Sequence, residues 1–311
     1  MAGLVKPLRI EHVFDDPLAI RRMVEGHGPY PAMASYLPAA TRDGQPGSAE
    51  GVLPWFRGTW AAHGRPLVHG AEVILHNPRF LQTASRLFDA SEVTPNTVVV
   101  NVTAPMPAGA VHVDVPSFWG ADRDHYPIRL LQAMGRSGLF DPWRTVEAGA
   151  VFWLYDGRGG AYDYWPEGLD GPMHSEHPPF TNSALVADND RMPHRIGWVG
   201  DPAARLPTIS VDAEISHLEH GGWAITDHGQ TVAHYGDEQI RISILWKAQV
   251  RSDRPGPGTA APLSPDLIVD IFSADLASRG VETPVSSSPL FDAAWVDLVH
   301  STYVIPLGVA S

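Results

Sequence analysis

The feature that most constrains the fold is a run of β-branched residues, Val98-Val99-Val100-Asn101-Val102, which lies between Pro95 and Pro105. Such a run predicts a buried strand, because β-branched side chains pack well on a pleated surface and proline interrupts a sheet. After a turn at residues 106–109, residues 110–115 predict a second strand. Further strands are predicted at residues 150–155, 183–187, 192–196 and 240–250.

Short strands separated by turns rich in Gly, Pro and Asp predict a β-sandwich or barrel, not alternating strands and helices. A tight turn is expected at residues 188–190 and a hairpin at residues 223–235. Helices are predicted on either side, at residues 17–23, 79–90, 264–278 and 289–298. We expect one domain, with a β core at about residues 94–250, an N-terminal helical and loop region at 1–93 and C-terminal helices at 264–299.

The absence of cysteine limits the chemistry. It excludes disulfides, thiolate–zinc sites, iron–sulfur clusters and cysteine nucleophiles. Any metal must be held by imidazole and carboxylate groups, which suit Fe(II), Mn(II) or Zn(II). Neither a Gly-x-Ser-x-Gly elbow nor a phosphate-binding glycine loop is found in the sequence.

The net charge of −13 argues against a nucleic-acid partner and against binding to an anionic membrane surface. Residues 1–7 lack the apolar stretch of a signal peptide, and no run approaches the roughly 20 apolar residues of a membrane-spanning helix. The sequence therefore predicts a cytoplasmic protein.

A metal site is predicted from the triplet His112-Val113-Asp114. On a strand, His112 and Asp114 project from the same face, and a divalent metal would compensate for burying them together. His194 is a suitable third ligand, because it follows the tight turn at 188–190 and can be presented across a barrel. Two imidazoles and one carboxylate leave adjacent coordination positions of iron open.

Other histidines compete for the third position. His174 and His177 lie in a proline-rich loop, where a ligand geometry is hard to hold, and His228 and His234 lie in or beside the predicted hairpin. We rank His194 first, His234 second and His177 third.

This pattern, over about residues 94–250, resembles the Fe(II)/2-oxoglutarate-dependent dioxygenase superfamily, broadly its phytanoyl-CoA-hydroxylase-like and small-molecule-hydroxylase branches. The resemblance implies a double-stranded β-helix (jelly-roll) barrel with flanking helices, in which His112, Asp114 and His194 hold Fe(II). It also implies that 2-oxoglutarate and molecular oxygen are used to oxidise a small organic molecule, for example in natural-product metabolism. Related halogenases lack the carboxylate, so Asp114 implies hydroxylation, desaturation or ring chemistry.

In that superfamily a basic residue near the last barrel strand pairs with the distal carboxylate of 2-oxoglutarate. Arg205 has the more familiar spacing from His194, whereas Arg241 opens a convincing strand and shares one face with Ser243. We favour Arg241, which requires an insertion at residues 200–238. Asn101 and Thr103 are candidates for hydrogen bonds to the co-substrate.

The substrate pocket is expected in a loop or flap at residues 36–66 and in residues 119–129, although ordinary packing under long loops explains these residues equally well. The candidates in the flap are aromatic or basic: Trp55, Phe56, Arg57, Trp60, His63 and Arg65. Trp153 and Tyr155 either line the cavity or belong to the core.

Two other functions stay open. One is a cupin-like metalloenzyme that works without 2-oxoglutarate, and the other is a non-enzymatic jelly-roll binding module whose His-x-Asp triplet is incidental. The C-terminal helices are expected either to cap the barrel or to form the contact of a homodimer.

Overall fold

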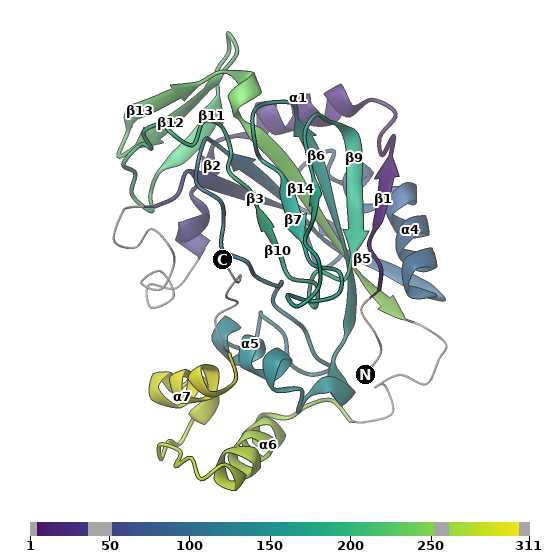
Figure 1. Cartoon of the computed structure of the whole chain (residues 1–311), viewed down its shortest axis with the longest axis vertical. Helices are drawn as coiled ribbons and strands as arrows, with labels where there is room; N and C mark the ends of the chain where they lie inside the picture. Colours follow the sequence, from purple (N-terminus) through teal and green to yellow (C-terminus); the bar gives the residue numbers. More distant parts are fainter. Residues whose placement is uncertain (1–4, 37–51, 252–260, 305–311) are drawn as a thin grey trace.

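The computed structural model describes residues 5–36, 52–251 and 261–304, and it is mainly β with helices around large antiparallel sheets (Figure 1). The largest sheet has seven strands in the order β1-β9-β6-β14-β5-β3-β4, and every neighbouring pair is antiparallel. Its strands are β1 (Leu8–Glu11), β3 (Trp55–Ala62), β4 (Arg65–Pro66), β5 (Glu92–Thr103), β6 (Val146–Tyr155), β9 (Phe180–Ala187) and β14 (Arg241–Arg251).

A smaller sheet has the order β10-β7-β8, with β7 (Tyr162–Tyr164), β8 (His174–Glu176) and β10 (His194–Ile196). Residues 106–114 run beside β10 as an extended segment that makes isolated bridges, Met106 with Val199 and His112 with His194. The prediction of a regular strand at 110–115 is therefore wrong. The partner strand β10 is short, because Pro193 and a turn directly precede it, so a continuous ladder of hydrogen bonds does not form.

The predicted insertion between β10 and β14 forms most of a third sheet, with the order β13-β12-β11-β2. Its strands are β2 (Tyr30–Pro31), β11 (Glu214–His217), β12 (Trp223–Asp227) and β13 (Gln230–Tyr235). The last two are the predicted hairpin. Short 3₁₀ turns occur at η1 (Met33–Tyr36), η2 (Asp141–Trp143), η3 (Asp237–Gln239) and η5 (Pro289–Phe291).

One face of the large sheet is covered by the helices α1 (Pro17–His27), α3 (Glu72–Leu75) and α4 (Pro78–Phe88). Phe152, Ile244 and Trp246 are fully buried in this core. The helices start at polar caps: the Asp16 carboxylate accepts a hydrogen bond from the backbone N–H of Ala19, and Asn77 caps α4 in the same way. The predicted helices at 17–23 and 79–90 are confirmed.

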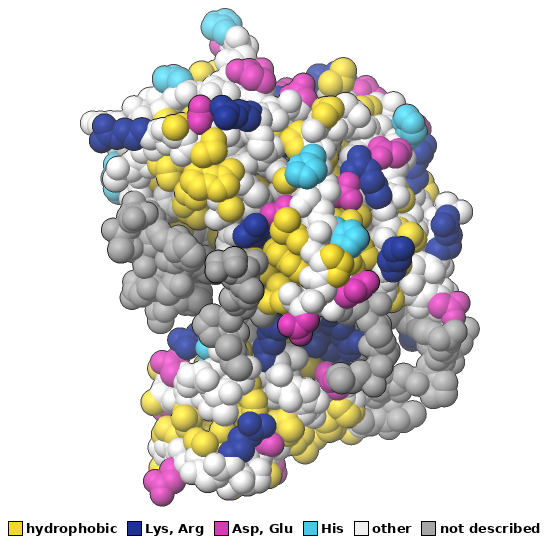
Figure 2. Space-filling model, viewed as in Figure 1, with side chains coloured by type: hydrophobic (Ala, Val, Ile, Leu, Met, Phe, Trp, Pro, Cys, Tyr) yellow, Lys and Arg dark blue, Asp and Glu magenta, His cyan; other side chains and the backbone are white. Residues whose placement is uncertain are grey.

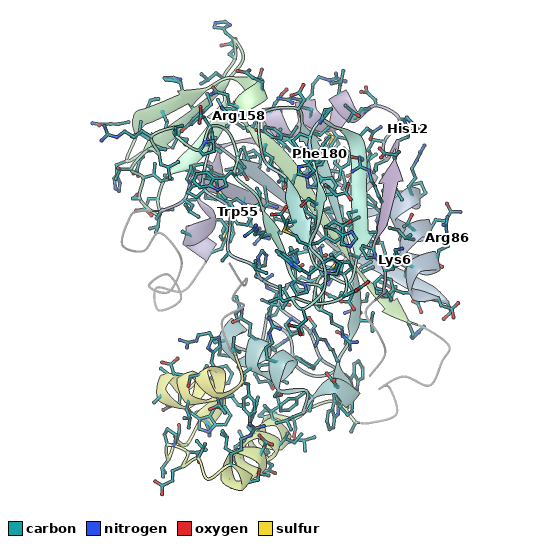
Figure 3. All side chains as sticks on the ribbon, in the orientation of Figure 1. Lys6, His12, Trp55, Arg86, Arg158 and Phe180 are labelled. Carbon is teal, nitrogen blue, oxygen red and sulfur yellow. The ribbon has the colours of Figure 1, made fainter. Side chains whose placement is uncertain are left out.

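The opposite face of the large sheet packs against the small sheet. Trp153 and Phe180 of the large sheet share one buried cluster with Tyr162 and Ile196 of the small sheet. Figure 3 shows the side chains of this part of the molecule and labels Trp55 and Phe180, on β3 and β9. The metal-ligand candidates lie on this side, which we call the interior face.

The helices α5 (Ile128–Ser137), α6 (Pro265–Ser278) and α7 (Ala293–Tyr303) form a separate lobe with its own hydrophobic core (Figure 1). The predicted helix at 264–278 is confirmed. The predicted helix at 289–298 is divided, because Asp292 caps a new helix by accepting from the backbone N–H of Trp295.

The expectation of a loop at residues 36–66 is wrong for residues 55–62, which form strand β3; residues 37–51 lie outside the described residues. Within the described parts of the chain, no helix combines the length and the apolar character needed to cross a membrane.

Candidate functional site

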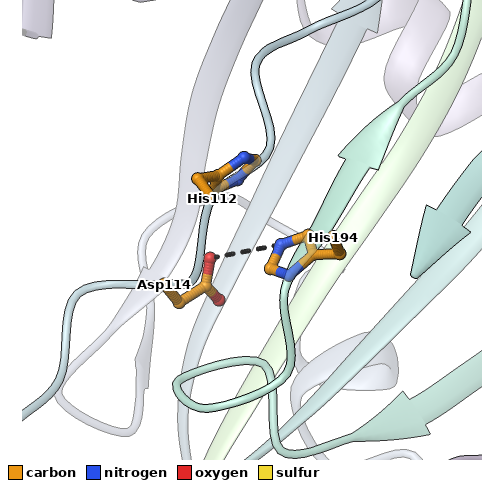
Figure 4. A group of neighbouring side chains, drawn as sticks. All are labelled: His112, Asp114 and His194. Atoms are coloured by element: carbon orange, nitrogen blue, oxygen red, sulfur yellow. Dashed lines mark ion pairs between the residues drawn. The ribbon is translucent and has the colours of Figure 1, made fainter. Parts of the chain in front are cut away.

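His112, Asp114 and His194 come together at the junction of the extended segment 106–114 and strand β10 (Figure 4). The backbones of His112 and His194 exchange two hydrogen bonds, of 3.0 and 2.8 Å. Directly paired residues of antiparallel strands point to the same face, so the two rings lie with their centroids 4.4 Å apart. Oδ1 of Asp114 is 3.7 Å from Nε2 of His194, and one ligand atom from each residue lies within 4.8 Å of the others.

Backbone carbonyl groups fix the orientation of both imidazoles. Nδ1 of His112 lies 3.0 Å from the oxygen of Ala110, and Nδ1 of His194 lies 2.9 Å from the oxygen of Met192. A carbonyl oxygen only accepts hydrogen bonds, so each Nδ1 carries the proton and each Nε2 keeps its lone pair in the neutral ring. This is the arrangement that surrounds histidines which bind metals.

The electrostatics favour the protonation states that bind a metal. Burial, together with the neighbouring His112, lowers the pKa of His194 to about 4, so its imidazole is neutral at pH 7. Burial raises the pKa of Asp114, but Lys247, His194 and His112 outweigh this effect and hold that pKa well below its usual range. His112 is exposed, so the cluster is open to solvent on one side.

Lys247 on β14 is part of this site and was missed by the sequence analysis. Its Nζ lies 3.0 Å from Oδ2 of Asp114, 2.9 Å from Oδ1 of Asp190 and 3.5 Å from Oε2 of Glu147. Burial lowers the pKa of Lys247, but the three carboxylates raise it well above its usual value. Lys247 therefore stays protonated and restrains Asp114 through Oδ2, leaving Oδ1 as the oxygen nearer His194.

A sequence signal for Lys247 exists. It stands six residues after Arg241 in a strand rich in apolar residues, and an even spacing on a strand places both side chains on one face. Its three acidic partners come from separate parts of the chain.

Arg241 is buried at the start of β14 and lies on the interior face. Its Nε donates a hydrogen bond of 2.8 Å to the carbonyl oxygen of Gly160, and its guanidinium lies 6.0 Å from the centre of the Phe180 ring. Burial lowers its pKa to about 10, against the effect of Tyr155 and Tyr162, so it is charged at pH 7.

No carboxylate of the described residues forms an ion pair with Arg241. The competing candidate, Arg205, is exposed in a loop that follows β10.

Polar side chains cross the interior face in one row. Ser243 on β14 is paired with Asn101 on β5 and with Trp153 on β6. Oδ1 of Asn101 accepts a hydrogen bond of 3.0 Å from Nε1 of Trp55. By contrast, Nε1 of Trp153 and Oγ1 of Thr103 are buried and find no hydrogen-bond partner in the part of the chain that the structure describes. Such groups cost free energy, and a bound polar molecule can supply the missing partners.

Trp153 and Tyr155 are both buried in the cluster between the two sheets, so they serve as core residues there.

The other candidate histidines lie elsewhere. His174, His177, His228 and His234 are all exposed. His174 belongs to strand β8 and stacks on Tyr164, so the expectation of a flexible loop at this position is wrong.

The aromatic and basic residues of the expected flap divide between two faces of β3. Trp55 packs against the interior cluster, and Arg57 is paired with Asn101 in the polar row. Phe56 and Trp60 are buried in the opposite core, under the helices, so they cannot line the same pocket. The remaining two, His63 and Arg65, are exposed.

A second group of possible metal ligands, Glu25, His217 and Asp237, lies near the third sheet. Its members already have protein partners: Glu25 forms an ion pair of 2.8 Å with Arg21, and Nε2 of His217 lies 3.2 Å from Oδ1 of Asp237. Without a cation these groups are already partly satisfied by one another and by Arg21.

Comparison with known proteins gives distant likenesses. No family model and no curated protein matches the sequence. Among solved structures, a 2OG-Fe(II) oxygenase family protein from Burkholderia pseudomallei is 12% identical, with 80% of this chain and 88% of that chain covered and a TM-score of 0.41. A prolyl-4-hydroxylase from Pseudomonas putida is 14% identical, with coverages of 80% and 95% and a TM-score of 0.40.

HygX from Streptomyces hygroscopicus, in a structure with nickel and 2-oxoglutarate bound, is 8% identical, with coverages of 84% and 86% and a TM-score of 0.41. The first of these proteins is described as a member of the 2OG-Fe(II) oxygenase family. The phytanoyl-CoA-hydroxylase-like branch stays a prediction.

Proposed function

We propose that the chain is an Fe(II)- and 2-oxoglutarate-dependent oxygenase in which His112, Asp114 and His194 hold the iron. The observation that carries the proposal is the convergence of two oriented imidazoles and one ionised carboxylate, with ligand atoms within 4.8 Å of one another. Two histidines and one carboxylate on one side of an iron ion leave adjacent positions free for other ligands. When bound, iron and 2-oxoglutarate would supply the oxidising chemistry.

The path of the chain supports a double-stranded β-helix. After β5 in the large sheet, the chain passes through 106–114 beside the small sheet, and β6 returns to the large sheet. The same alternation continues through β7 and β8, then β9, then β10, and finally β14. This repeated crossing between two facing sheets is how such a barrel is wound.

Arg241 is the residue proposed to bind the distal carboxylate of 2-oxoglutarate. It is a buried cation without an ion-pair partner in the described residues, and its Nε is already used by Gly160. The two remaining nitrogens of the planar guanidinium can bind a carboxylate in a bidentate manner. Ser243 and Asn101, in the next row of the sheet, and Oγ1 of Thr103 are proposed to add polar contacts.

The other residues of the site position groups and exclude water. Lys247 holds Oδ2 of Asp114, while Trp153, Tyr162 and Phe180 form an aromatic wall between the two sheets. The retained carboxylate of Asp114 supports hydroxylation, desaturation or ring chemistry on a small organic molecule. A role in natural-product metabolism is part of the same proposal.

The test is anaerobic addition of Fe(II) and 2-oxoglutarate to the purified protein. We expect one equivalent of iron to bind and a visible charge-transfer band to appear when 2-oxoglutarate is added. His194→Ala should abolish both, and His177→Ala, which changes an exposed histidine outside the cluster, should change neither. Iron binding without the band would favour the cupin-like enzyme, and absence of stoichiometric iron would favour the binding module.

A further inference from the structure

Arg57 is a second arginine of the interior face that forms no ion pair with an acidic side chain of the described residues. Its strand position pairs it with Asn101, which is paired in turn with Ser243, so the three side chains share one face. Arg57 and Ser243 lie on either side of β5, with about 10 Å between their backbones. The Nε of Arg57 is buried and has no hydrogen-bond partner among residues 5–36, 52–251 and 261–304.

Burial has the largest effect on the pKa of Arg57 and lowers it, whereas the Asp114 carboxylate raises it. Asp114 is already occupied, because Lys247 lies 3.0 Å from its Oδ2 and Oδ1 faces the histidines. Arg123 has the opposite effect to Asp114 and lowers the pKa of Arg57, so a second guanidinium acts on this position.

The protein as a whole is acidic, with a net charge of −13. The chain has 35 acidic and 22 basic residues, so positive charge is scarce overall. Figure 2 nevertheless shows Lys and Arg side chains gathered in the hollow between the sheets and the helical lobe. Charge of one sign in a hollow attracts ligands of the opposite sign.

Of Arg241 and Arg57, the proposed co-substrate provides an anionic partner for only one. 2-Oxoglutarate has one carboxylate to spare after the other binds the metal, and Arg241 is placed to receive it. We propose that Arg57, assisted by Arg123, binds an anionic oxygen group, a carboxylate or phosphate, of the primary substrate beside the metal. This inference rests on the proposed function and adds the substrate class.

A guanidinium suits such a group because its parallel N–H donors match two oxygens of a carboxylate or phosphate. The orphaned Nε of Arg57 would gain its missing partner, and the substrate would be held close to Asp114. Arg57 is then a specificity-determining residue that leaves the binding of metal and 2-oxoglutarate unchanged.

The experiment uses protein loaded with Mn(II) and saturated with 2-oxoglutarate. Two probes are titrated separately: inorganic phosphate, followed by ³¹P relaxation, and trifluoroacetate, followed by ¹⁹F relaxation. Because Mn(II) is paramagnetic, an anion held beside it relaxes faster in a saturable way. We expect such binding for at least one probe, and the tighter one tells which anion the site prefers.

The variants separate Arg57 from its neighbours. Arg57→Gln should weaken probe binding at least about tenfold, as expected for a lost charge-assisted contact, and Arg57→Lys should weaken it less. Arg123→Gln, at an exposed position, should also weaken probe binding. It provides a second test if Arg57→Gln does not fold. The control is Arg86→Gln on α4, an exposed arginine far from the site in Figure 3, which should bind the probe as the unaltered protein does.

Equal probe binding in Arg57→Gln, Arg123→Gln and the unaltered protein would overturn the inference, as would absence of saturable binding in the unaltered protein. A fall in 2-oxoglutarate affinity that matches the fall in probe affinity would also overturn it, by assigning Arg57 to the co-substrate. Failure of Mn(II) to bind is a different result, because it would contradict the proposed metal centre.

Discussion

Nζ of Lys247 lies 3.0 Å from Oδ2 of Asp114, so a buried cation contacts the carboxylate that is proposed to bind iron. The same Nζ is within 3.5 Å of carboxylate oxygens of Asp190 and Glu147. The single positive charge of Lys247 is therefore paired with three largely buried carboxylates. Removing it would leave mutually repelling carboxylates without compensation.

We therefore expect Lys247→Met to lower the free energy of unfolding by about 3–5 kcal/mol, the range for a buried ion pair that loses one partner. The comparison variant is Arg251→Met, at the C-terminal end of β14, whose ion pair with Glu92 is exposed. An exposed pair contributes about 0–1 kcal/mol. Urea unfolding at pH 7.5 measures both, and equal losses in the two variants would contradict the role of Lys247.

The choice between the two arginines proposed for 2-oxoglutarate can be tested directly. Arg241→Ala should weaken anaerobic 2-oxoglutarate binding by roughly 10- to 100-fold, because charge-assisted hydrogen bonds contribute about 1.5–3 kcal/mol. Arg205→Ala, in an exposed loop, should stay within about twofold of the unaltered protein, since exposed arginines contribute little. The measurement is titration of the visible band, and the opposite ranking would reassign the co-substrate contact.

Gly160 is predicted to be intolerant of a side chain. Its φ is 73°, and an added Cβ would lie 2.8 Å from Cε1 of Tyr155 and 2.9 Å from Cδ of Arg241. In Gly160→Ala, overpacking should lower the free energy of unfolding by about 1–3 kcal/mol beyond the loss that backbone strain causes. The variant should also bind 2-oxoglutarate more weakly, because the new methyl group would displace Arg241.

Gly168→Ala provides the matched control. Gly168 has a φ of 85° and open space around the added Cβ, so this variant carries the backbone strain without the crowding. If thermal unfolding and 2-oxoglutarate titration give the same values for both alanine variants, the proposed crowding at Gly160 is wrong.

Asp188 is predicted to make stability depend on pH. Burial, with help from Asp190, raises its pKa from 3.8 to about 6. The folded protein therefore keeps a proton between about pH 4 and 6 that the unfolded chain has lost. The stability gained from the protonated carboxyl is fully present below about pH 4 and is lost as the pH rises through 6.

Asp188→Asn removes this loss. The difference in free energy of unfolding between the variant and the unaltered protein should therefore rise by about 2–3 kcal/mol from pH 4 to pH 8. This estimate takes about 1.36 kcal/mol for each unit by which the pKa is shifted. Urea unfolding at a series of pH values measures the difference, and Asp201→Asn, at an exposed position, serves as the control. A difference that does not change with pH would contradict the prediction.

The parts of the fold that were predicted are those with local signals. Val98–Val102 and residues 240–250 are rich in apolar and β-branched side chains; the first lies in the C-terminal half of β5 and the second makes up most of β14. Asp16 and Ser264 are polar caps in front of helical patterns, and both accept hydrogen bonds at the start of their helices. Local propensity and tertiary structure agree at these places.

The parts that were missed depend on long-range contacts. Strand β3 follows a segment rich in Gly and Pro and is stabilised by pairing with β5, which local sequence does not reveal. Lys247 acquires its role only because Asp114, Glu147 and Asp190 are brought to it from three other segments. The spacing of His112 and Asp114 indicated the cluster although their segment is not a regular strand, because two residues of an extended chain still share a face.

The sparse pairing between residues 106–114 and β10 has a consequence for how the molecule responds to a metal. Two of the candidate ligands lie on the segment and the third lies on the strand, so one ion bound by all three would cross-link chain segments that few backbone hydrogen bonds join. Removing the metal with a chelator would remove this cross-link. The amide hydrogens of Gly109 and His112 would then exchange with solvent faster, whereas those in the middle of β5 and β14 would keep their exchange rates. The amount of available metal would therefore change how well residues 106–114 are ordered beside β10, without unfolding the large sheet.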